Sequence, residues 1–138
     1  MEADKEKYLT QSAYIRREAG ELSPNHEDFI EMICRMGDMP VRIKNLSQWL
    51  GVSPSVASRS ASALRDLGYC TFEKYGFVTL TDKGRETGRY LIRRHRAVER
   101  LLTLICGEAE LAEVEKTEHY LSEATVEKIE RFLDGREA

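Results

Sequence analysis

The sequence predicts a mainly α-helical fold with one small β-wing, and three features support this prediction. Apolar residues recur at helical spacing through much of residues 27–133. Two short runs rich in aromatic and β-branched residues, 69–72 and 77–80, flank a turn and predict a β-hairpin. Gly51 and Gly107 each follow a periodic segment, in the position where glycine commonly ends a helix. The chain has 138 residues, which fits one domain or a domain with a second, half-sized one.

Two helices are predicted before residue 51. The first covers about residues 27–35 and ends at the breaker sequence MGDMP. Val41 and Ile43 form a short extended entry to the second helix. Asn45 or Ser47 caps that helix, and Gly51 ends it.

A third helix follows after a very short turn. Ser53 is a good N-cap, and Pro54 occupies the first helical position, where its missing N–H has no intrahelical partner to lose. This helix runs to about Leu67, and the hairpin comes directly after it. The order helix, short turn, helix, hairpin is that of a winged helix-turn-helix.

The rest of the chain predicts three more helices. Thr81 caps a long one that continues to Ile105, and a second covers about residues 109–121. Ser122 caps the last helix. Its apolar face is formed by Val126, Ile129, Phe132 and Leu133. Cys106, at the end of the long helix, is predicted to be a small buried hydrophobe.

Charge is distributed unevenly along the chain. The net charge of −3 at pH 7 divides into −3 for residues 1–36, +6 for 37–105 and −6 for 106–138. A basic middle segment favours contact with a polyanion, and an acidic end favours cation binding or a solvated helix face. The charge distribution thus indicates two candidate sites, one for a polyanion in residues 37–105 and one for a cation in residues 106–138.

The third predicted helix carries a face suited to DNA. The side chains on this face are small or basic, which permits close approach to a major groove, hydroxyl contacts to phosphates and arginine contacts to guanine edges. Lys74 and Tyr75 at the hairpin tip could reach the backbone or minor groove. An exposed helix or a protein-interaction wing is the alternative. The predicted contact residues are Ser53, Pro54, Ser55, Ser58, Arg59, Ser62, Arg65, Lys74 and Tyr75.

Potential metal ligands recur at helical spacing. Glu115, Glu118 and His119 lie at positions i, i+3 and i+4, so one helix face presents all three. Asp28 and Glu31 share a face of the first helix in the same way, and His95 lies on the inner side of the long helix. Taken alone, such carboxylates more often form a solvated helix face, and such a histidine more often lies in a core. Spacing within each helix does not show whether the three helices meet.

In order along the chain stand the motifs HEDFIE, LGVSPSVASR, TDKGRE, RRHRAVERLL and VEKTEHYLS. Together they resemble the diphtheria toxin repressor and manganese transport regulator family over about residues 26–134. The resemblance implies a homodimeric winged-helix repressor that binds palindromic operator DNA when loaded with a divalent metal and so controls metal homeostasis. It also implies three segments: an N-terminal arm (1–25), a DNA-binding domain (26–83) and a helical dimerisation and metal-sensing domain (84–138).

The resemblance also implies a ligand set. By motif, Asp28 and Glu31 match the first-helix ligands, His95 the long-helix histidine, and Glu115, Glu118 and His119 the last three. Members of the iron type carry methionine and cysteine where this chain has Asp28 and Glu115. Oxygen ligands favour Mn²⁺, with Fe²⁺, Co²⁺ and Zn²⁺ as alternatives. One departure is Leu111, which stands where the iron type has a histidine of a second site.

The C-terminal helices carry more apolar surface than one short chain can cover, which predicts a two-fold dimer. The candidate interface residues are Leu101, Leu102, Ile105, Phe132 and Leu133. No nucleophile–base pair or phosphate loop favours an enzyme. Neither a secretory signal nor an apolar run of membrane length is recognisable, so we expect a cytoplasmic protein with no membrane partner. A metal-independent winged-helix regulator that senses a small organic ligand is the alternative function.

Overall fold

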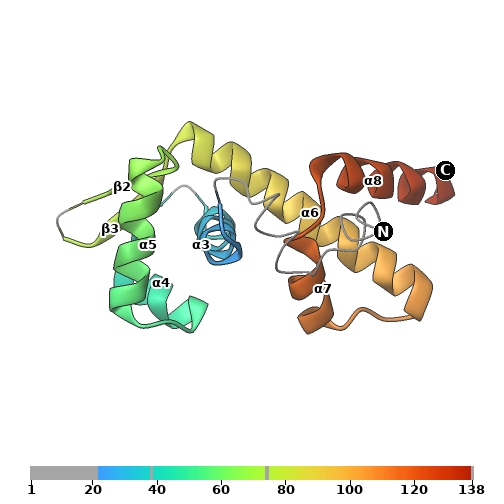
Figure 1. Cartoon of the computed structure of the whole chain (residues 1–138), viewed down its shortest axis with the longest axis horizontal. Helices are drawn as coiled ribbons and strands as arrows, with labels where there is room; N and C mark the ends of the chain where they lie inside the picture. Colours follow the sequence, from blue (N-terminus) through green and yellow to red (C-terminus); the bar gives the residue numbers. More distant parts are fainter. Residues whose placement is uncertain (1–21, 38, 74, 138) are drawn as a thin grey trace, which may run out of the picture.

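The computed structural model describes residues 22–37, 39–73 and 75–137. Most of the predicted N-terminal arm and Lys74 lie outside these residues. Helices are labelled as in Figure 1, from α3. The elements in chain order are α3 (Pro24–Arg35), β1 (Val41–Arg42), α4 (Ile43–Leu50), α5 (Pro54–Asp66), β2 (Cys70–Phe72), β3 (Phe77–Leu80), α6 (Asp82–Cys106), α7 (Leu111–Glu118) and α8 (Glu123–Glu137). The predicted fold class, mainly helical with a small wing, is confirmed.

The first half of the chain folds around one apolar core. The antiparallel sheet has the strand order β1-β3-β2, with Val41 opposite Val78 and Cys70 opposite Leu80. Helices α3, α4 and α5 cover it, and their buried side chains meet the sheet in one cluster: Phe29, Ile30, Ile33, Leu46, Ala57, Ala61 and Leu64. Burial of this much apolar surface is the main stabilising term for a unit of this size.

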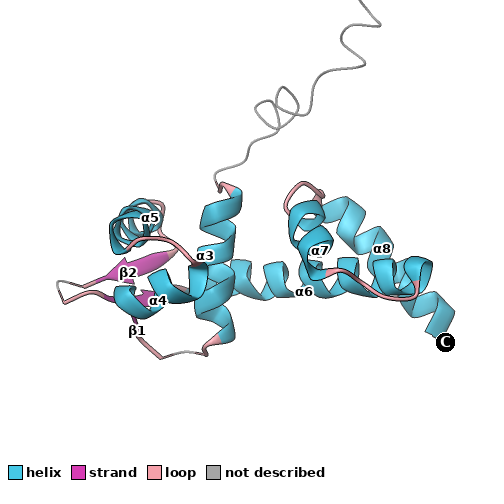
Figure 2. Ribbon diagram, turned by 90° about the horizontal axis from the view of Figure 1, so that it is seen from below, coloured by secondary structure: helices cyan, strands magenta, loops and turns pink. Residues whose placement is uncertain are grey.

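Helix α6 runs from beside the sheet and α5 to the opposite end of the molecule (Figure 1). Its first half packs on α3, and its second half carries α7 and α8, as Figure 2 shows from another side. Val98, Val114, Val126 and Leu133 are buried between these three helices. No described helix is long and apolar enough to cross a membrane. The predicted boundary between residues 83 and 84 falls in the first turn of α6, and the division into domains stays a prediction.

Caps explain most helix ends. The side chains of Ser53, Thr81 and Ser122 accept hydrogen bonds from backbone N–H groups in the first turns of α5, α6 and α8, as predicted. Gly51 ends α4 with a φ of 68°, a left-handed conformation that glycine adopts without strain. These signals are local, which is why sequence alone could locate them.

Several predicted boundaries were wrong. Helix α3 begins at Pro24 rather than residue 27, because Ser23 accepts from the N–H of His26 and caps the helix earlier. Helix α4 begins at Ile43, and Ser47 is buried inside it, where its hydroxyl donates to the carbonyl of Lys44. The helix predicted over 109–121 is limited to α7, and Cys106 is exposed.

Two glycines on α6 permit close packing. A Cβ at Gly84 would lie 2.0 Å from the carbonyl oxygen of Tyr69, and one at Gly88 would lie 2.6 Å from the Cβ of Cys34 on α3. The first contact presses the start of α6 against the chain entering β2, and the second presses α3 against α6. The wing and α3 are therefore both fixed on the first half of α6.

We expect Gly84→Ala to lower the free energy of unfolding by about 3 kcal/mol, because a backbone carbonyl cannot move away from the new methyl group. Urea denaturation followed by circular dichroism measures this change. Gly135→Ala is the matched control: it lies in α8, and a Cβ there meets nothing within 4 Å. The control should raise stability by about 0.5–1 kcal/mol. Equal effects of the two variants would contradict the packing described here.

Candidate metal centre

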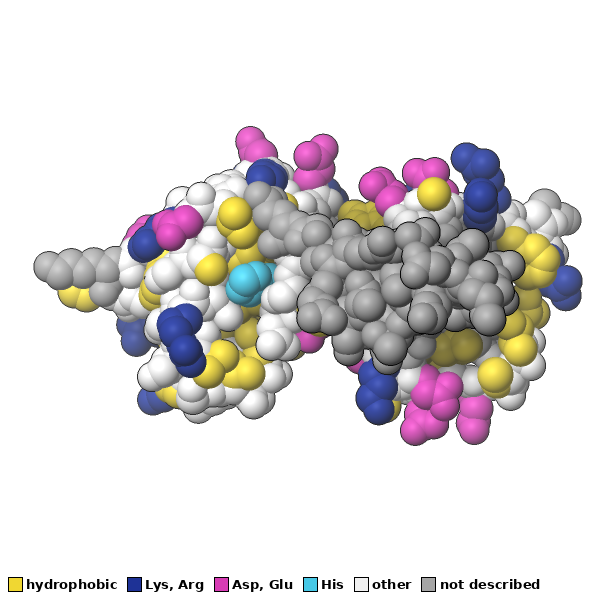
Figure 3. All heavy atoms as spheres, viewed as in Figure 1, with side chains coloured by type: hydrophobic (Ala, Val, Ile, Leu, Met, Phe, Trp, Pro, Cys, Tyr) yellow, Lys and Arg dark blue, Asp and Glu magenta, His cyan; other side chains and the backbone are white. Residues whose placement is uncertain are grey.

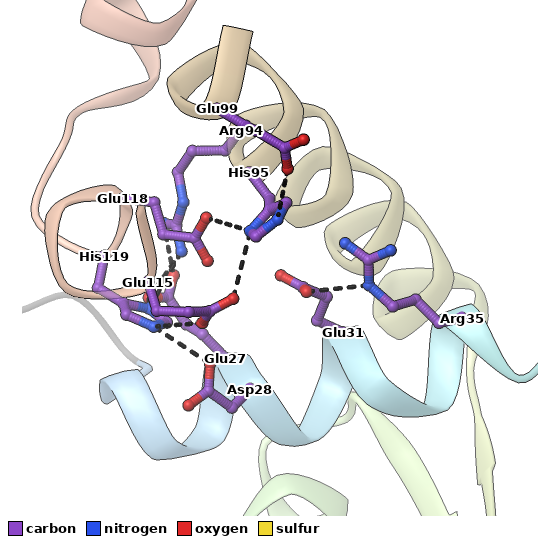
Figure 4. Close-up of polar contacts among 10 residues, drawn as sticks. All are labelled: Glu27, Asp28, Glu31, Arg35, Arg94, His95, Glu99, Glu115, Glu118 and His119. Atoms are coloured by element: carbon purple, nitrogen blue, oxygen red, sulfur yellow. Dashed lines mark hydrogen bonds and ion pairs between the residues drawn. The ribbon is translucent and has the colours of Figure 1, made fainter. Parts of the chain in front are cut away.

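All six predicted ligands meet where α3, α6 and α7 approach one another (Figure 4). On α3, Phe29, Ile30 and Ile33 are buried in the first core, which leaves Asp28 and Glu31 on the face toward α6 and α7. The helical period explains this division, because residues three or four apart share a face. Helix α3 therefore contributes apolar side chains to the core shared with the sheet, α4 and α5, and it contributes carboxylates on the opposite face.

The first group of potential ligands consists of Glu31, His95, Glu115 and Glu118, whose ligand atoms all lie within 4.8 Å of one another. His95 Nδ1 is 2.8 Å from Glu118 Oε2 and 3.3 Å from Glu115 Oε1. Glu31 Oε2 also accepts from Arg35 Nε at 3.1 Å. One imidazole nitrogen and three carboxylates from three helices thus surround one point.

The second group consists of Asp28, Glu115 and His119, whose ligand atoms also lie within 4.8 Å of one another. His119 Nε2 is 3.1 Å from Asp28 Oδ1 and 4.0 Å from Glu115 Oε2. Glu115 belongs to both groups and can offer one oxygen to each. A pocket beside this second group is lined by Pro24, Asp28, Glu115, Lys116, His119 and Tyr120.

Glu118 is the most deeply buried group of the centre, with none of its side chain exposed. Burial and the nearby charge of Glu115 raise its pKa to about 7, against the opposing effect of His95. Its Oε1 atom has no hydrogen-bond partner among the described residues. A buried carboxylate oxygen without a donor is costly, and a bound cation would satisfy it.

The other titratable groups show the same crowding of negative charge. Burial and the charge of Glu31 raise the pKa of Glu115. Burial lowers the pKa of His119, but hydrogen bonds and charges from Asp28 and Glu27 outweigh this effect and raise the pKa to about 10. The centre therefore holds extra protons at neutral pH. Once these protons are displaced, a donor set of carboxylates and imidazoles fits a hard divalent cation.

Two residues near the centre, Glu27 and Arg94, were missed by sequence reasoning. Glu27 accepts from Arg94 and lies 3.0 Å from His119 Nδ1, and Glu99 Oε2 lies 3.3 Å from His95 Nε2. Each histidine thus has a carboxylate behind the nitrogen that faces away from the cluster. The only sequence signals were that Glu27 adjoins Asp28 and that Arg94 adjoins His95, and adjacency alone does not place side chains together.

The predicted DNA-contacting residues lie on and before α5 and at the wing. Ser53, Pro54, Ser55, Arg59 and Arg65 are exposed, and Ser58 and Ser62 are half-buried. Tyr75 at the wing tip is 82% exposed. Arg65 Nε lies 3.4 Å from Asp66 Oδ1 in a solvent-exposed pair. The face is thus accessible, as a contact surface must be.

The predicted interface residues differ in exposure. Ile105 and Phe132 are 68% and 52% exposed, whereas Leu101 and Leu102 are half-buried. Leu133 is only 4% exposed, because it packs inside the chain between the C-terminal helices. It therefore offers almost no surface to a partner, and its place in the predicted interface has no support from its exposure.

Comparison with known proteins identifies the family. Residues 81–137 match the family described as iron dependent repressor, metal binding and dimerisation domain. The HTH-type transcriptional regulator MntR of Lysinibacillus sphaericus is 33% identical over 111 residues, which cover 78% of this chain and 80% of that protein. The chain belongs to the diphtheria toxin repressor and manganese transport regulator family. The resemblance seen in the motifs is confirmed.

Solved structures of this family share the fold. A manganese-dependent transcriptional repressor solved in complex with manganese is 31% identical, with a TM-score of 0.69 over 78% of this chain. The manganese regulator SloR is 27% identical, with a TM-score of 0.71 over 82% of this chain. The chain spans about half the length of these two proteins, 52% and 55%.

We expect Mn²⁺ to bind more tightly as pH rises from 6 to 8, because the ion must displace protons. At pH 7, Glu118 with a pKa of about 7 is half protonated, and His119 with a pKa of about 10 carries its extra proton. Binding at pH 7 should release about one and a half protons per chain. Calorimetry in two buffers with different ionisation enthalpies measures this number.

His119→Ala is the control for this measurement and should reduce the release by about one proton. Metal affinity that does not change with pH, or a proton count near zero in the wild-type protein, would show that these two groups are not displaced by the ion.

Proposed function

We propose that this chain is a homodimeric transcriptional repressor that binds palindromic operator DNA when it carries a divalent metal, with Mn²⁺ as the physiological ion, and so controls metal homeostasis. One observation carries the proposal. Two groups of potential ligands share Glu115 and come from three helices, of which α3 packs in the same core as α5, the proposed reading helix. An ion bound here would tie α3 to α7.

The donor chemistry supports the choice of Mn²⁺. Every one of the six proposed ligands offers oxygen or nitrogen, and none offers sulfur. Carboxylate and imidazole suit Mn²⁺, although the usual affinity order places Co²⁺ and Zn²⁺ above it at such sites. Two solved relatives, a manganese regulator and a manganese-dependent repressor, favour the same ion. Two groups that share Glu115 could hold two ions, one per group.

Metal would act on DNA binding through α3. Phe29, Ile30 and Ile33 on this helix pack in the same core as Leu64 of α5, the proposed reading helix. The opposite face of α3 carries Asp28 and Glu31. Fixing these carboxylates to His119, Glu115 and Glu118 on α7 restricts the orientation of the reading unit. Restriction of this kind can raise affinity through entropy as well as through displacement.

The dimer would form at the end of α6. Figure 3 shows hydrophobic side chains gathered at the end of the molecule next to the last turns of α6. Leu104, Ile105 and Phe132 are all more than two-fifths exposed. A two-fold interface here would hold two α5 helices at a fixed separation, which operator DNA requires to be about 34 Å for successive major-groove faces. Such a repressor works in the cytoplasm, where its operator lies.

We expect Glu115→Ala to abolish metal-stimulated DNA binding while leaving the fold intact, because Glu115 serves both ligand groups. The measurement is fluorescence anisotropy at fixed salt on palindromic DNA selected from a random pool, with chelator and then with Mn²⁺. Glu113→Ala is the matched control: it removes an exposed carboxylate from the same helix outside both groups.

Two outcomes would reject this assignment. A normal Mn²⁺ response in Glu115→Ala would show that the site lies elsewhere. Wild-type binding that is equal in chelator and in Mn²⁺ would support the alternative, a metal-independent regulator that senses a small organic ligand.

We expect Arg59→Ala to weaken operator binding by about 1–3 kcal/mol without changing Mn²⁺ affinity, because Arg59 is exposed on α5 and adjoins neither ligand group. Arg131→Ala removes an exposed arginine from α8 and is the control. Anisotropy at matched salt distinguishes the two, since loss of any single charge would weaken non-specific binding. Equal effects of both variants would remove α5 as the reading helix.

A further inference from the structure

His119 has a carboxylate on each side of its ring. Its Nε2 atom faces the potential metal ligands Asp28 and Glu115, whereas Nδ1 lies 3.0 Å from Glu27 Oε1 (Figure 4). Glu27 is not part of either ligand group. A neutral histidine that binds an ion through Nε2 must carry its proton on Nδ1, and that proton needs an acceptor. Glu27 supplies one.

Arg94 fixes the position of Glu27. Its Nη1 atom donates to Glu27 Oε2 at 3.1 Å and its Nη2 atom to Oε1 at 3.3 Å, a two-pronged pair that orients the carboxylate. The Arg94 side chain is 3% exposed and that of Glu27 is 16% exposed. Nη2 also lies 3.2 Å from His119 Nδ1. When His119 carries its proton on Nδ1, this atom and Arg94 Nη2 are both donors, and Glu27 Oε1 accepts a hydrogen bond from each.

We propose that Glu27 and Arg94 are positioning residues of the metal centre: Arg94 holds Glu27 against His119 Nδ1, which orients the ring so that Nε2 faces the ion. This inference rests on the proposed metal-binding function. A carboxylate behind a ligating histidine fixes the proton on the distal nitrogen and makes the ligating nitrogen more basic. The contacts of Glu27 with Arg94 and His119 also join α3, α6 and the end of α7 without any ion. They therefore place the proposed ligands near one another before an ion binds.

A neighbouring pair provides a matched comparison. Arg93, one residue earlier on α6, pairs with Glu130 of α8 at 2.7 Å. The Arg93 side chain is 56% exposed, and no histidine contact is recorded for this pair among the described residues. Two consecutive arginines thus each bind a glutamate from another helix, but only the Arg94 pair adjoins the metal centre. Removal of Glu130 tests the loss of a glutamate partner without affecting His119.

The test compares Glu27→Met with Glu130→Met. Methionine is similar in length to glutamate but carries no charge, and its sulfur is only a weak acceptor for the Nδ1 proton. Mn²⁺ affinity is measured from the electron paramagnetic resonance signal of the free aqueous ion. We expect Glu27→Met to weaken Mn²⁺ binding 10- to 100-fold. Glu130→Met should change it by less than about twofold, as expected for an exposed pair.

A second readout follows the ring of His119 directly. Long-range ¹H–¹⁵N spectra of the Zn²⁺-loaded protein, which is diamagnetic, distinguish a protonated Nδ1 from a metal-bound Nε2. We expect this arrangement in the wild-type protein and in Glu130→Met. In Glu27→Met we expect the signal of the Nδ1 proton to disappear through exchange with water. A residue that only supported the fold would not produce this selective change.

Glu27→Met leaves the charge of Arg94 buried without its partner, which can prevent folding. The double variant Glu27→Met/Arg94→Met removes both charges and undergoes the same two measurements, with the same expected results. Wild-type Mn²⁺ affinity and an unchanged His119 spectrum in a folded variant would overturn this inference alone. Failure of the wild-type protein to bind Mn²⁺ would reject the proposed function and this inference with it.

Discussion

Repulsion among the carboxylates at the junction of α3, α6 and α7 is the interaction that sets how the candidate metal centre responds to ions and protons. Burial of Glu118 intensifies it, because low dielectric strengthens every unfavourable pair. Burial and the charge of Glu115 raise the pKa of Glu118, and hydrogen bonds to Asp28 and Glu27 raise that of His119 against the opposing effect of burial. The extra protons on these two groups offset part of the repulsion. A bound divalent cation would offset more of the repulsion among the carboxylates. The polar contacts of α3 with His119 thus depend on protons, and an ion would hold α3 and α7 together more firmly.

The position of α3 makes this local balance relevant to the whole molecule. Apolar residues fix one side of α3 in the core shared with α4 and α5, and Gly88 lets Cys34 of the same helix approach α6 closely. Contacts between α3 and α7 are of a different kind, since the recorded ones join Glu27 and Asp28 to His119. A polar contact of this type responds to charge and protonation, whereas the apolar core does not.

The sequence predicted those features that depend on local rules. Caps at Ser53 and Thr81, the hairpin, and the shared face of Glu115 and His119 all follow from spacing within a single element. The start of α3 was missed, since Ser23 and Pro24 resembled a turn. The role of neighbours across helices could not be predicted at all. Glu27 adjoins Asp28, yet only the packing of α6 and α7 shows that it meets Arg94 and His119. The burial of Leu133 likewise depends on α6.

The length of α6 has a mechanical consequence. Its 25 residues form one continuous helix, about 37 Å long at 1.5 Å per residue. The wing and α3 are fixed near its start, and the exposed apolar residues lie near its end. A rod of this length that pivots by about 5° at one end moves its other end by about 3 Å. In the proposed dimer the helix would act as a lever arm, so that slight changes in how two copies meet would be amplified into the spacing of their proposed reading helices.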